Sequence, residues 1–594
     1  MKRHLAVATI AIAGLLFGAG ATHATTAEPT PCGPETPGGP FLVDADCIDP
    51  TYASPVIDST SETTDPIPLH VVSGHFEGTD KTFRVLLPSE EQWEGRFFQF
   101  TYPLEGQEPT DSVKFGAENG GYTVQTSGGA GYRHLAAAAK FSRTIAAEHY
   151  GVAAGSITGY VYGWSGGSFQ TIGAMENTRD VWQGGVPIVL GVETSIPNNF
   201  AVRGLAGFVL QDEREQIIAA LRPGGSGDPY AGLDPLERDA LTEATRMGVP
   251  LQAWEDFDYL ADRSSLQGLG NGVRAADPSY VEDFWDDPRY LGAEQSELGQ
   301  LFRDALAEDD TLDNRWNLAL LAYHRYQVPT RAGFSTFDQY RDANGQPIYP
   351  QRPELYSANV ARGVSGGAAY TGGINGKVIA VEGTLDSDAF PWHGDWYADQ
   401  VRASLGADAD DSFRLWYVDN ADHNPYDRQG AAGTRLVGYL PVVFQALTDV
   451  AAWAESGVAP PHSTAYDFSD GQISLPEDAR TRRGPQPVLD LEVRGATAER
   501  PATVGKKVRF TAAAEVPRGA GKVVSMEWDF DGDGTYEPTA VKHPKNKVVV
   551  NAAHAYAEPG TYYVSVKVGS QRDGDSGDKL TVIRNLDRVR VVVR

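Results

Sequence analysis

The amino-acid sequence predicts an α/β fold, with helices on both faces of a parallel sheet, a helical insertion and a separate all-β sandwich. Three observations predict this architecture. Strand-like apolar runs alternate with helical stretches over residues 61–200 and again over 371–457. Between them, residues 201–370 break the rhythm with helical segments rich in aromatic side chains. From residue 487 to residue 594, short β-rich runs separated by turn signals dominate.

The elements of the first α/β segment follow from their residue types. Four runs rich in β-branched and aromatic residues predict strands: IPLHVVSGHF, KTFRVLLP, GRFFQFTYP and GYTVQTSG. The alanine-rich stretch HLAAAAKFSRTIAAEHYG predicts a helix. Next come a strand, ITGYVYG, a helix to about Thr178, and another strand, GGVPIVLG. Alternation of this kind is typical of a parallel sheet.

The rest of the chain continues the same analysis. The insertion 201–370 is expected to form a helical lid. The strand-helix rhythm returns with KVIAVEG and FRLWYV, and a long helix closes the unit near Gly457. Residues 458–486 are rich in Pro, Ser, Asp and Arg, which indicates a linker. Runs such as VLDLEVRG, KKVRFTAAAEV and GTYYVSVKVGS then predict the small sandwich.

Length and charge restrict the class of protein. A chain of 594 residues is expected to hold several domains. With 41% hydrophobic and 22% charged residues, it has the composition of a globular protein. The net charge of −29 indicates a soluble surface that repels nucleic acid and anionic membranes, so we expect neither as a partner.

The N-terminus predicts export. Lys2 and Arg3 precede a short apolar run and then small residues, which is the pattern of a secretory signal peptide over residues 1–24. Cleavage fits after Ala24 or after Ala27. No later segment holds about 20 consecutive apolar residues, so no membrane span is expected. We therefore expect a secreted, extracellular protein.

The chain has two cysteines, Cys32 and Cys47, both in a loop-rich N-terminal extension that covers residues 25–60. In an oxidising compartment a disulfide between them is the expected state. No cysteine remains to act as a catalytic thiol. We expect no metal site and no cofactor.

Two serines match the pattern G-x-S-x-G, in GWSGG at Ser165 and in GVSGG at Ser365. The pattern marks a nucleophile only where a strand precedes the serine and a helix follows it. Ser165 has both, because ITGYVYG comes before it and SFQTIGAMENT after it. Ser365 is followed by GGAAYTGGING, which cannot hold a helix, and lies only 21 residues before the best acid candidate. We predict Ser165 as the nucleophile and Ser365 as a loop residue.

An acid and a histidine follow in the expected chain order. Asp386 lies three residues beyond Gly383 at the end of a late strand, with Asp388 as the alternative acid. His423 lies 37 residues beyond Asp386, in a polar turn after the last strand. His393 lies seven residues beyond Asp386 and is expected at a helix start or in the cleft wall.

These residue types define the expected chemistry. Ser165 is a poor nucleophile until a base accepts its proton, and His423 is that base. Asp386 orients the imidazole and stabilises its protonated form.

Two amides or hydroxyls are needed to stabilise the oxyanion. The Gly166 amide, at the start of the helix, is the expected first donor. For the second, the segment FQFTYPLEG offers the Tyr102 hydroxyl or the Leu104 amide, since Pro103 has no amide hydrogen. Tyr102 is equally compatible with a simple packing role.

Longer motifs resemble known families. The segments AAAAKFSRTIAAEHYG, GYVYGWSGGSFQTIGAMENTRDVWQGGVP and AAWAESGVAP resemble an α/β-hydrolase, and within that fold are remotely similar to the tannase and feruloyl esterase family. This resemblance implies a secreted serine esterase with a lid. That family has cysteines directly before its nucleophile and after its histidine; here Trp164 and Asn424 occupy these positions. WDFDGDG together with HAYAEPGTYYVSV resembles a PKD-type immunoglobulin-like domain over the last hundred residues.

Three functional hypotheses remain open at this point. The first is a secreted serine hydrolase that cleaves small-molecule or polymeric carboxylic esters through an acyl-enzyme. The second is an amidase or peptidase with the same triad, because motif and chain order do not separate C–O from C–N cleavage. The third is a non-catalytic adhesion or matrix protein. In each case the sandwich is a candidate surface for contact with a polymer or another protein.

One acidic motif in the sandwich has a second interpretation. Asp529, Asp531 and Asp533 alternate as in calcium-binding loops. The same segment, DFDGDGTYE, also fits an ordinary turn of a PKD-like domain.

Overall fold

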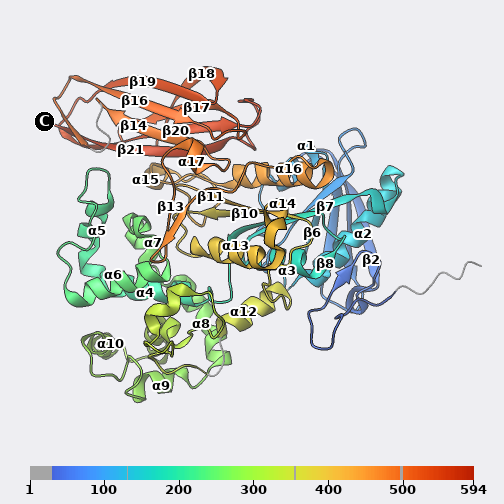
Figure 1. Ribbon diagram of the computed structural model, residues 1–594, viewed down its shortest axis with the longest axis horizontal. Coiled ribbons are helices and arrows are strands. Elements are labelled where there is room, and N and C mark those ends of the chain that lie inside the picture. The colour runs from blue at the N-terminus through green and yellow to red at the C-terminus, as the bar shows by residue number, and fades with distance from the viewer. Residues whose placement is uncertain (1–29, 130, 353–355, 495–498) are drawn as a thin grey trace, which may run out of the picture.

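The structure is a computed structural model that describes residues 30–129, 131–352, 356–494 and 499–594. The expected signal peptide, residues 1–24, lies outside these residues. Figure 1 shows three parts: a sheet flanked by helices, a helical insertion beside it, and a β-sandwich above both. None of the described helices is long and apolar enough to cross a membrane.

The central sheet has nine strands in the order β11-β10-β9-β7-β5-β6-β4-β3-β2. Strands β2, β3, β4 and β6 pair antiparallel in turn, and the neighbouring pairs from β6 to β11 are parallel. The strands are β2 (Pro55–Thr63), β3 (Leu69–Phe76), β4 (Thr82–Leu87), β5 (Arg96–Phe100), β6 (Gly121–Thr126), β7 (Thr158–Ser165), β9 (Gly184–Leu190), β10 (Lys377–Gly383) and β11 (Phe413–Val418).

Helices cover both faces of this sheet, because its central strands are apolar on both sides. One face carries α2 (Tyr132–Tyr150), α3 (Gly166–Asn177) and α13 (Trp392–Leu405). The other carries α1 (Ser112–Glu118) and α16 (Leu440–Ser456). Strand β7 is buried at six successive positions, as expected for a strand between two helical layers. The sheet order and the helix placement are those of the α/β-hydrolase fold, which confirms the predicted fold class.

The helical insertion has a core of its own, built largely from aromatic side chains. Arg352 ties two of its segments together, since its guanidinium donates to Asp277 and Asp283. The helices of the insertion are α4 (Asn198–Val209), α5 (Arg214–Leu221), α6 (Pro235–Met247), α7 (Phe257–Ala261), α8 (Ser264–Ala276), α9 (Tyr280–Asp286), α10 (Glu297–Glu308), α11 (Leu312–Leu321) and α12 (Tyr356–Ser365).

The C-terminal sandwich packs two sheets around a core that includes Trp528 and Phe510. The sheets are β14-β16-β19 and β15-β21-β20-β17-β18. Their strands are β14 (Val488–Val493), β15 (Glu499–Ala502), β16 (Lys507–Glu515), β17 (Lys522–Asp529), β18 (Glu537–Lys545), β19 (Lys547–Ala555), β20 (Gly560–Gln571) and β21 (Ile583–Val593). This all-β part agrees with the predicted immunoglobulin-like sandwich.

Shorter elements complete the chain. The pairing of β1 with β8 joins the N-terminal extension to the end of α3. The segment before the sandwich contains a small hairpin and a helical turn. These elements are β1 (Val43–Asp44), β8 (Thr178–Arg179), α14 (Ala409–Ser412), α15 (Gly430–Gly433), β12 (Asp467–Ser469), β13 (Gln472–Ser474) and α17 (Ala479–Arg482).

The N-terminal extension differs from the expectation in one respect. A disulfide joins Cys32 and Cys47, as predicted. The extension does not stay loop-like to residue 60, however, because β2 forms the edge of the main sheet. Seven of its nine side chains are exposed, so no hydrophobic alternation marked it as a strand.

Candidate active site

Ser165 sits in a strained turn between a strand and a helix. Strand β7 ends at Ser165 and α3 begins at Gly166. The backbone of Ser165 has φ 51° and ψ −116°, in the region that non-glycine residues rarely adopt. Strain at such a position marks a candidate functional residue. The turn is the strand-turn-helix context that the sequence predicts for Ser165.

The glycines around Ser165 are required by close backbone approaches. A Cβ atom on Gly163 would lie 2.3 Å from the carbonyl oxygen of Thr101, and one on Gly167 would lie 2.1 Å from the same atom. On Gly166 it would lie 2.6 Å from Cγ of Pro103. The turn therefore packs directly against the segment that follows β5, which is where the oxyanion donors are expected.

Asp386 and His423 are brought together at the carboxyl end of the sheet. Asp386 follows β10 and His423 follows β11, two adjacent parallel strands. Nδ1 of His423 lies 2.7 Å from Oδ2 of Asp386. The other carboxylate oxygen, Oδ1, accepts the backbone N–H groups of Asp388 and Ala389, each at 2.8 Å. Asp386 is thus held by three donors and is fully buried.

The environment of His423 favours its protonated form. Burial by itself lowers the pKa of the imidazole, but the charge and hydrogen bond of Asp386, with smaller contributions from Asp388 and Asp422, raise it to about 9. The Tyr439 hydroxyl donates to the His423 carbonyl oxygen at 2.9 Å and fixes the backbone. His423 therefore has the partners of a base whose imidazolium is stabilised.

Asp388, the alternative acid, has different partners. Its carboxylate forms an ion pair with Arg203 of α4, whose side chain is 3% exposed, and accepts the hydroxyl of Tyr259 at 2.8 Å. Asp388 thus joins the insertion to the loop after β10. Sequence reasoning missed Arg203; its only signal was a lone arginine within the apolar run NNFAVRGLAGFV.

Tyr102 lies beside the candidate nucleophile. Its hydroxyl is close enough to the Ser165 side chain to interact with it, and burial and the charge of Asp388 raise its pKa, against the opposing effect of Ser165. A raised pKa keeps the hydroxyl protonated, so it remains able to donate. Gly166, as the first residue of α3, has an amide without an intrahelical partner. The side chain of Leu104 is 66% exposed.

Tyr102 lines a cavity of about 360 Å³. Leu104 lies at its wall, together with polar side chains that include Gln107, Glu108 and Gln125. Burial raises the pKa of Glu108 to about 7, while hydrogen bonds from Ser112 and Gln125 oppose the shift. Tyr102 thus lines this cavity and also lies beside Ser165.

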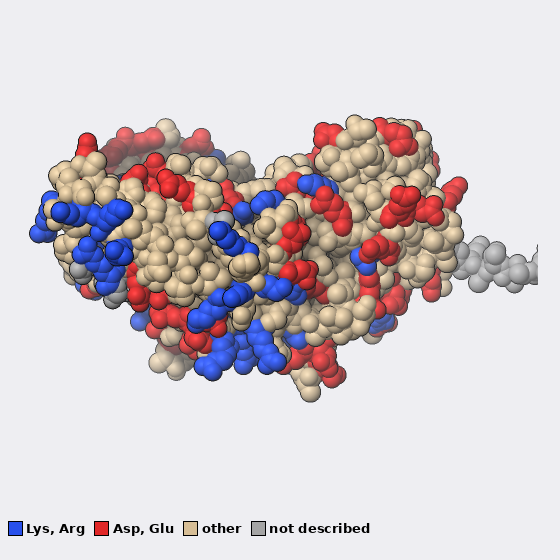
Figure 2. All heavy atoms as spheres, turned by 90° about the horizontal axis from the view of Figure 1, so that it is seen from above, with Lys and Arg blue, Asp and Glu red and all other residues tan. Residues whose placement is uncertain are grey.

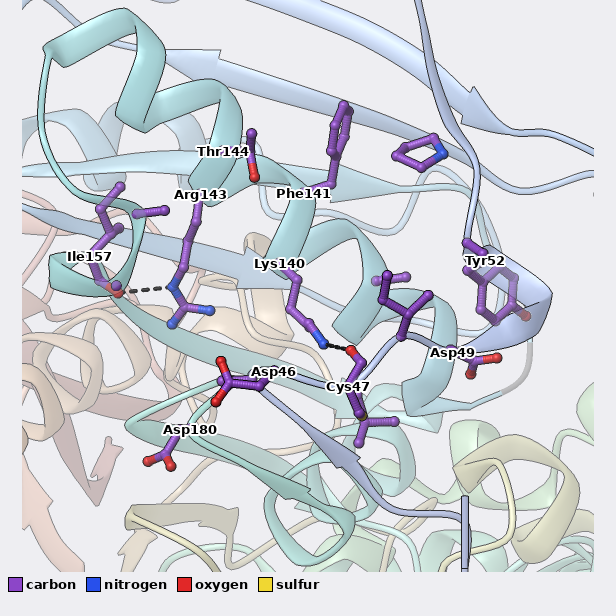
Figure 3. A pocket seen from close by; sticks show the side chains of 18 of the residues that line it. Asp46, Cys47, Asp49, Tyr52, Lys140, Phe141, Arg143, Thr144, Ile157 and Asp180 are labelled. Atoms are coloured by element: carbon purple, nitrogen blue, oxygen red, sulfur yellow. Dashed lines mark hydrogen bonds between the residues drawn. The ribbon is translucent and has the colours of Figure 1, made fainter. Parts of the chain in front are cut away.

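A second cavity, of about 600 Å³, lies away from these residues (Figure 3). It is bordered by the disulfide loop, by α2 and by residues at the starts of β7 and β9, which is the opposite end of the strands. The two basic side chains that line it donate hydrogen bonds to backbone carbonyl oxygens. Lys140 Nζ donates to the carbonyl of Asp44 at 2.7 Å and to that of Cys47, and Arg143 Nε donates to the carbonyl of Ile157 at 2.9 Å. This cavity contains none of the predicted site residues.

Ser365 and His393 have structural partners. Ser365 is the last residue of α12, not a loop residue as expected, and its hydroxyl accepts the N–H of Ala368. His393 lies in the first turn of α13, as expected, where Nδ1 contacts the Leu190 carbonyl oxygen at 2.7 Å. Burial lowers its pKa to about 3. Neither residue has the partners of Ser165 or His423.

The acidic motif of the sandwich forms a turn. The Asp529 carboxylate accepts four backbone N–H groups, from Asp531, Gly532, Asp533 and Gly534. These bonds give the motif the form of a turn. Within the described ranges, no group of three or more His, Cys, Asp or Glu side chains is arranged to hold a metal ion.

Comparisons with known proteins identify the C-terminal sandwich. The family model described as PKD domain matches residues 490–583, which confirms the expected identity of the C-terminal sandwich. No curated protein matches the chain. Among solved structures, the chain is similar to feruloyl esterase B from Aspergillus oryzae, at 15% identity and TM-score 0.36, over 72% of this chain and 92% of that one. It is also similar to tannin acyl hydrolase from Aspergillus niger, at 14% identity and TM-score 0.35, over 71% and 86%.

Proposed function

We propose that this protein is a secreted serine hydrolase that cleaves carboxylic esters through Ser165, His423 and Asp386. The observation that carries the proposal is the 2.7 Å contact between His423 and Asp386 at the carboxyl edge of the sheet, the same edge at which β7 delivers Ser165 in its strained turn. Serine, histidine and acid in this arrangement form a charge-stabilised nucleophile and base.

The proposed reaction proceeds in two halves. His423 accepts the proton of Ser165 as its Oγ attacks the ester carbonyl carbon, and the protonated imidazole then donates that proton to the leaving alkoxide. The resulting acyl-enzyme is hydrolysed when His423 activates a water molecule. Asp386 holds Nδ1 in both halves, so Nε2 is the atom that exchanges protons.

Two hydrogen-bond donors are assigned to stabilise the oxyanion that forms in each half of the reaction. The Gly166 amide lies at the positive N-terminal end of α3, and the Tyr102 hydroxyl lies near the Ser165 side chain. The polar cavity beside Tyr102 accommodates the acyl or the alcohol part of the ester. The helical insertion, joined to the site through Arg203 and Tyr259, serves as its lid.

The test is labelling with a fluorophosphonate probe together with ester turnover. Wild type is expected to label, and Ser165→Ala to lose labelling and at least about a thousandfold in kcat. Ser365→Ala is the matched control, because that serine has the same five-residue motif, and it should label as wild type. Labelling lost in Ser365→Ala and kept in Ser165→Ala would overturn the assignment. Matched ester and amide substrates decide between an esterase and an amidase.

A further inference from the structure

The C-terminal sandwich contacts two parts of the proposed active site, and strand β21 takes part in both contacts. Figure 1 shows β21 on the side of the sandwich that faces the rest of the molecule, above α15 and α16. Its side chains Ile583 and Leu586 belong to the same apolar core as Tyr439 and Leu440, which follow the catalytic histidine. The sandwich is therefore packed on the hydrolase and is not a tethered, independent module.

The first part that β21 holds is the loop carrying His423, residues 419–438, here called the histidine loop. Asn420, three residues before His423, has a left-handed backbone with φ 57°. Its Nδ2 donates to Oδ1 of Asn585 at 2.9 Å and to the carbonyl oxygen of Leu586 at 3.1 Å. Asn585 is 2% exposed. Buried amide pairs of this kind fix both geometry and register.

The same loop is held further along its length. Arg584 forms an ion pair with Asp427, with 3.1 Å between Nη1 and Oδ2. The hydroxyls of Tyr536 and Ser565 donate to the carbonyl oxygens of Gly433 and Thr434, at 3.0 and 3.1 Å. These contacts place most of the histidine loop against the sandwich, with His423 between the two fixed ends.

The second part is the helical insertion. Arg588 of β21 donates through both terminal nitrogens to the two carboxylate oxygens of Glu255, at 2.8 and 2.6 Å. The two side chains are only 13% and 6% exposed, so the pair is largely withdrawn from water. Arg590 adds a bond to the Gly224 carbonyl oxygen at 2.9 Å. A bidentate pair of this kind is specific in direction as well as in distance.

The two attachments meet close to the triad. A small cavity of about 40 Å³ is bordered at once by Arg588, by Tyr259 of the insertion, by Ser387 beside Asp386, and by Asp422 beside His423. Arg435 of the histidine loop also forms an ion pair with Asp256, next to Glu255, at 2.8 Å. Strand β21, the insertion and the loops of both triad partners thus share one packed junction.

Charge complements this docking. Residues 487–594 contain 17 Lys and Arg against 14 Asp and Glu, although the whole chain carries −29. Among the described residues, three ion pairs cross the boundary, Arg588 with Glu255, Arg572 with Asp449 and Arg584 with Asp427, and in each the cation belongs to the sandwich. Figure 2 shows most of the Lys and Arg side chains of this face over the left and centre, where the sandwich lies, with Asp and Glu among them, and mainly Asp and Glu at the opposite end.

From these contacts we infer that the C-terminal sandwich is a positioning part of the active site. Asn585 holds the histidine loop and Arg588 holds the insertion, and their common strand fixes the distance between the two. The inference rests on the proposed function. It gives the sandwich a role in turnover of small soluble esters, where contact with a polymer contributes nothing.

The first test breaks the attachment to the insertion. Turnover of p-nitrophenyl acetate by the full-length chain is expected to fall about tenfold in kcat/KM in Arg588→Ala, because small displacements of site groups cost large rate factors. Arg588→Lys keeps the charge and one bond, and should recover part of the loss. Lys547→Ala, which removes an exposed ion pair on the outer sheet of the sandwich, should match wild type.

The second test breaks the attachment to the histidine loop. Asn420→Gly keeps the left-handed backbone and removes only the side-chain bonds to β21. We expect kcat to fall about tenfold with KM little changed, and the midpoint of the pH profile of kcat to move, because His423 is held less firmly by Asp386. A variant that is merely less stable keeps that midpoint when assayed well below its unfolding temperature.

The outcomes separate the two proposals. If wild type neither labels with a fluorophosphonate nor turns over the ester, the proposed function fails. If wild type is active, and Arg588→Ala and Asn420→Gly retain its kcat, KM and pH profile, the proposed function stands and the positioning role of the sandwich is overturned.

Discussion

Nδ1 of His423 lies 2.7 Å from Oδ2 of Asp386, with the carboxylates of Asp388 and Asp422 close enough to act on the same imidazole. A general base must be neutral to accept a proton, and the pKa of this histidine is raised to about 9. We therefore expect kcat/KM to rise with pH and to reach half its maximum at about pH 9. Initial rates measured between about pH 6 and pH 10 check this.

The effect of the Asp422 charge on the pKa of His423 can be tested separately from that of Asp386. Asp422→Asn removes one negative charge while its side-chain oxygen still accepts the N–H of Asn424. The midpoint of the profile should shift to lower pH, because the imidazolium loses a stabilising charge. Asp410→Asn, at an exposed position on α14, controls for the change in net charge. An identical midpoint in Asp422→Asn and wild type would contradict the prediction.

The pair of His423 and Asp386 also makes the stability of the folded chain depend on pH, and stability should fall over the pH range in which kcat/KM rises. Because the folded-state pKa of His423 lies above its unfolded value of 6.5, the protonated histidine stabilises the folded chain. This contribution is fully present below about pH 6.5 and is lost as pH rises through about 9. Urea unfolding at several pH values should show the decline in wild type and a smaller one in Asp386→Asn, where the carboxylate charge is gone.

The Tyr102 hydroxyl can be tested as an oxyanion donor without disturbing packing. Tyr102→Phe keeps the ring and removes only the hydroxyl that lies near Ser165. If this hydroxyl stabilises the transition state, kcat should fall by about 10²–10³ with KM nearly unchanged. A rate equal to that of wild type would assign the second donor to the Leu104 amide and leave Tyr102 with a packing role.

The glycines of the nucleophile turn predict a strong steric effect. In Gly163→Ala the new methyl group would lie 2.3 Å from the Thr101 carbonyl oxygen, with backbone on both sides that cannot yield. We expect a loss of about 3 kcal/mol in the free energy of unfolding, near the upper end for overpacking. Gly155→Ala, where nothing lies within 4 Å, should unfold with the wild-type midpoint. Equal midpoints for both variants would exclude the close approach.

Local pattern was sufficient to predict most of the sheet and the chain order of the site. Strand runs such as KVIAVEG mark where parallel strands end, and side chains just beyond those ends meet at one edge. The spacing beyond Gly383 favoured Asp386 over Asp388, and in the structure Asp386 contacts His423 while Asp388 pairs with Arg203. The role of each acid is decided by its partner, His423 for Asp386 and Arg203 for Asp388, and both partners are distant from the acids in the chain.

Contacts across long sequence separations were not predictable. Arg203 and Asp388 are 185 residues apart, and Asn420 and Asn585 are 165 apart. Neither pair has a local periodicity or motif that links its members. The sandwich was expected as a surface for an outside polymer or protein, because its sequence shows only that it folds as a unit. Its docking on the histidine loop emerges only from the three-dimensional arrangement.

The disulfide of the N-terminal extension should contribute stability and leave catalysis unchanged. Cys32 and Cys47 are 15 residues apart, and closing a loop of that size is worth about 3 kcal/mol in the chain-entropy model. The extension is also held by Lys140, whose amino group donates to the carbonyl oxygens of Asp44 and Cys47, at the end of the strands opposite the triad.

The double variant Cys32→Ser, Cys47→Ser should therefore unfold at lower urea concentration and retain wild-type kcat when assayed well below its unfolding temperature. Wild type treated with a reducing agent should match it, since both lack the same covalent link. If the unfolding midpoint is unchanged by both treatments, the noncovalent contacts of Lys140 alone hold the extension. If kcat falls in the folded variant, the extension is coupled to the triad through α2, which contacts α3 behind Ser165.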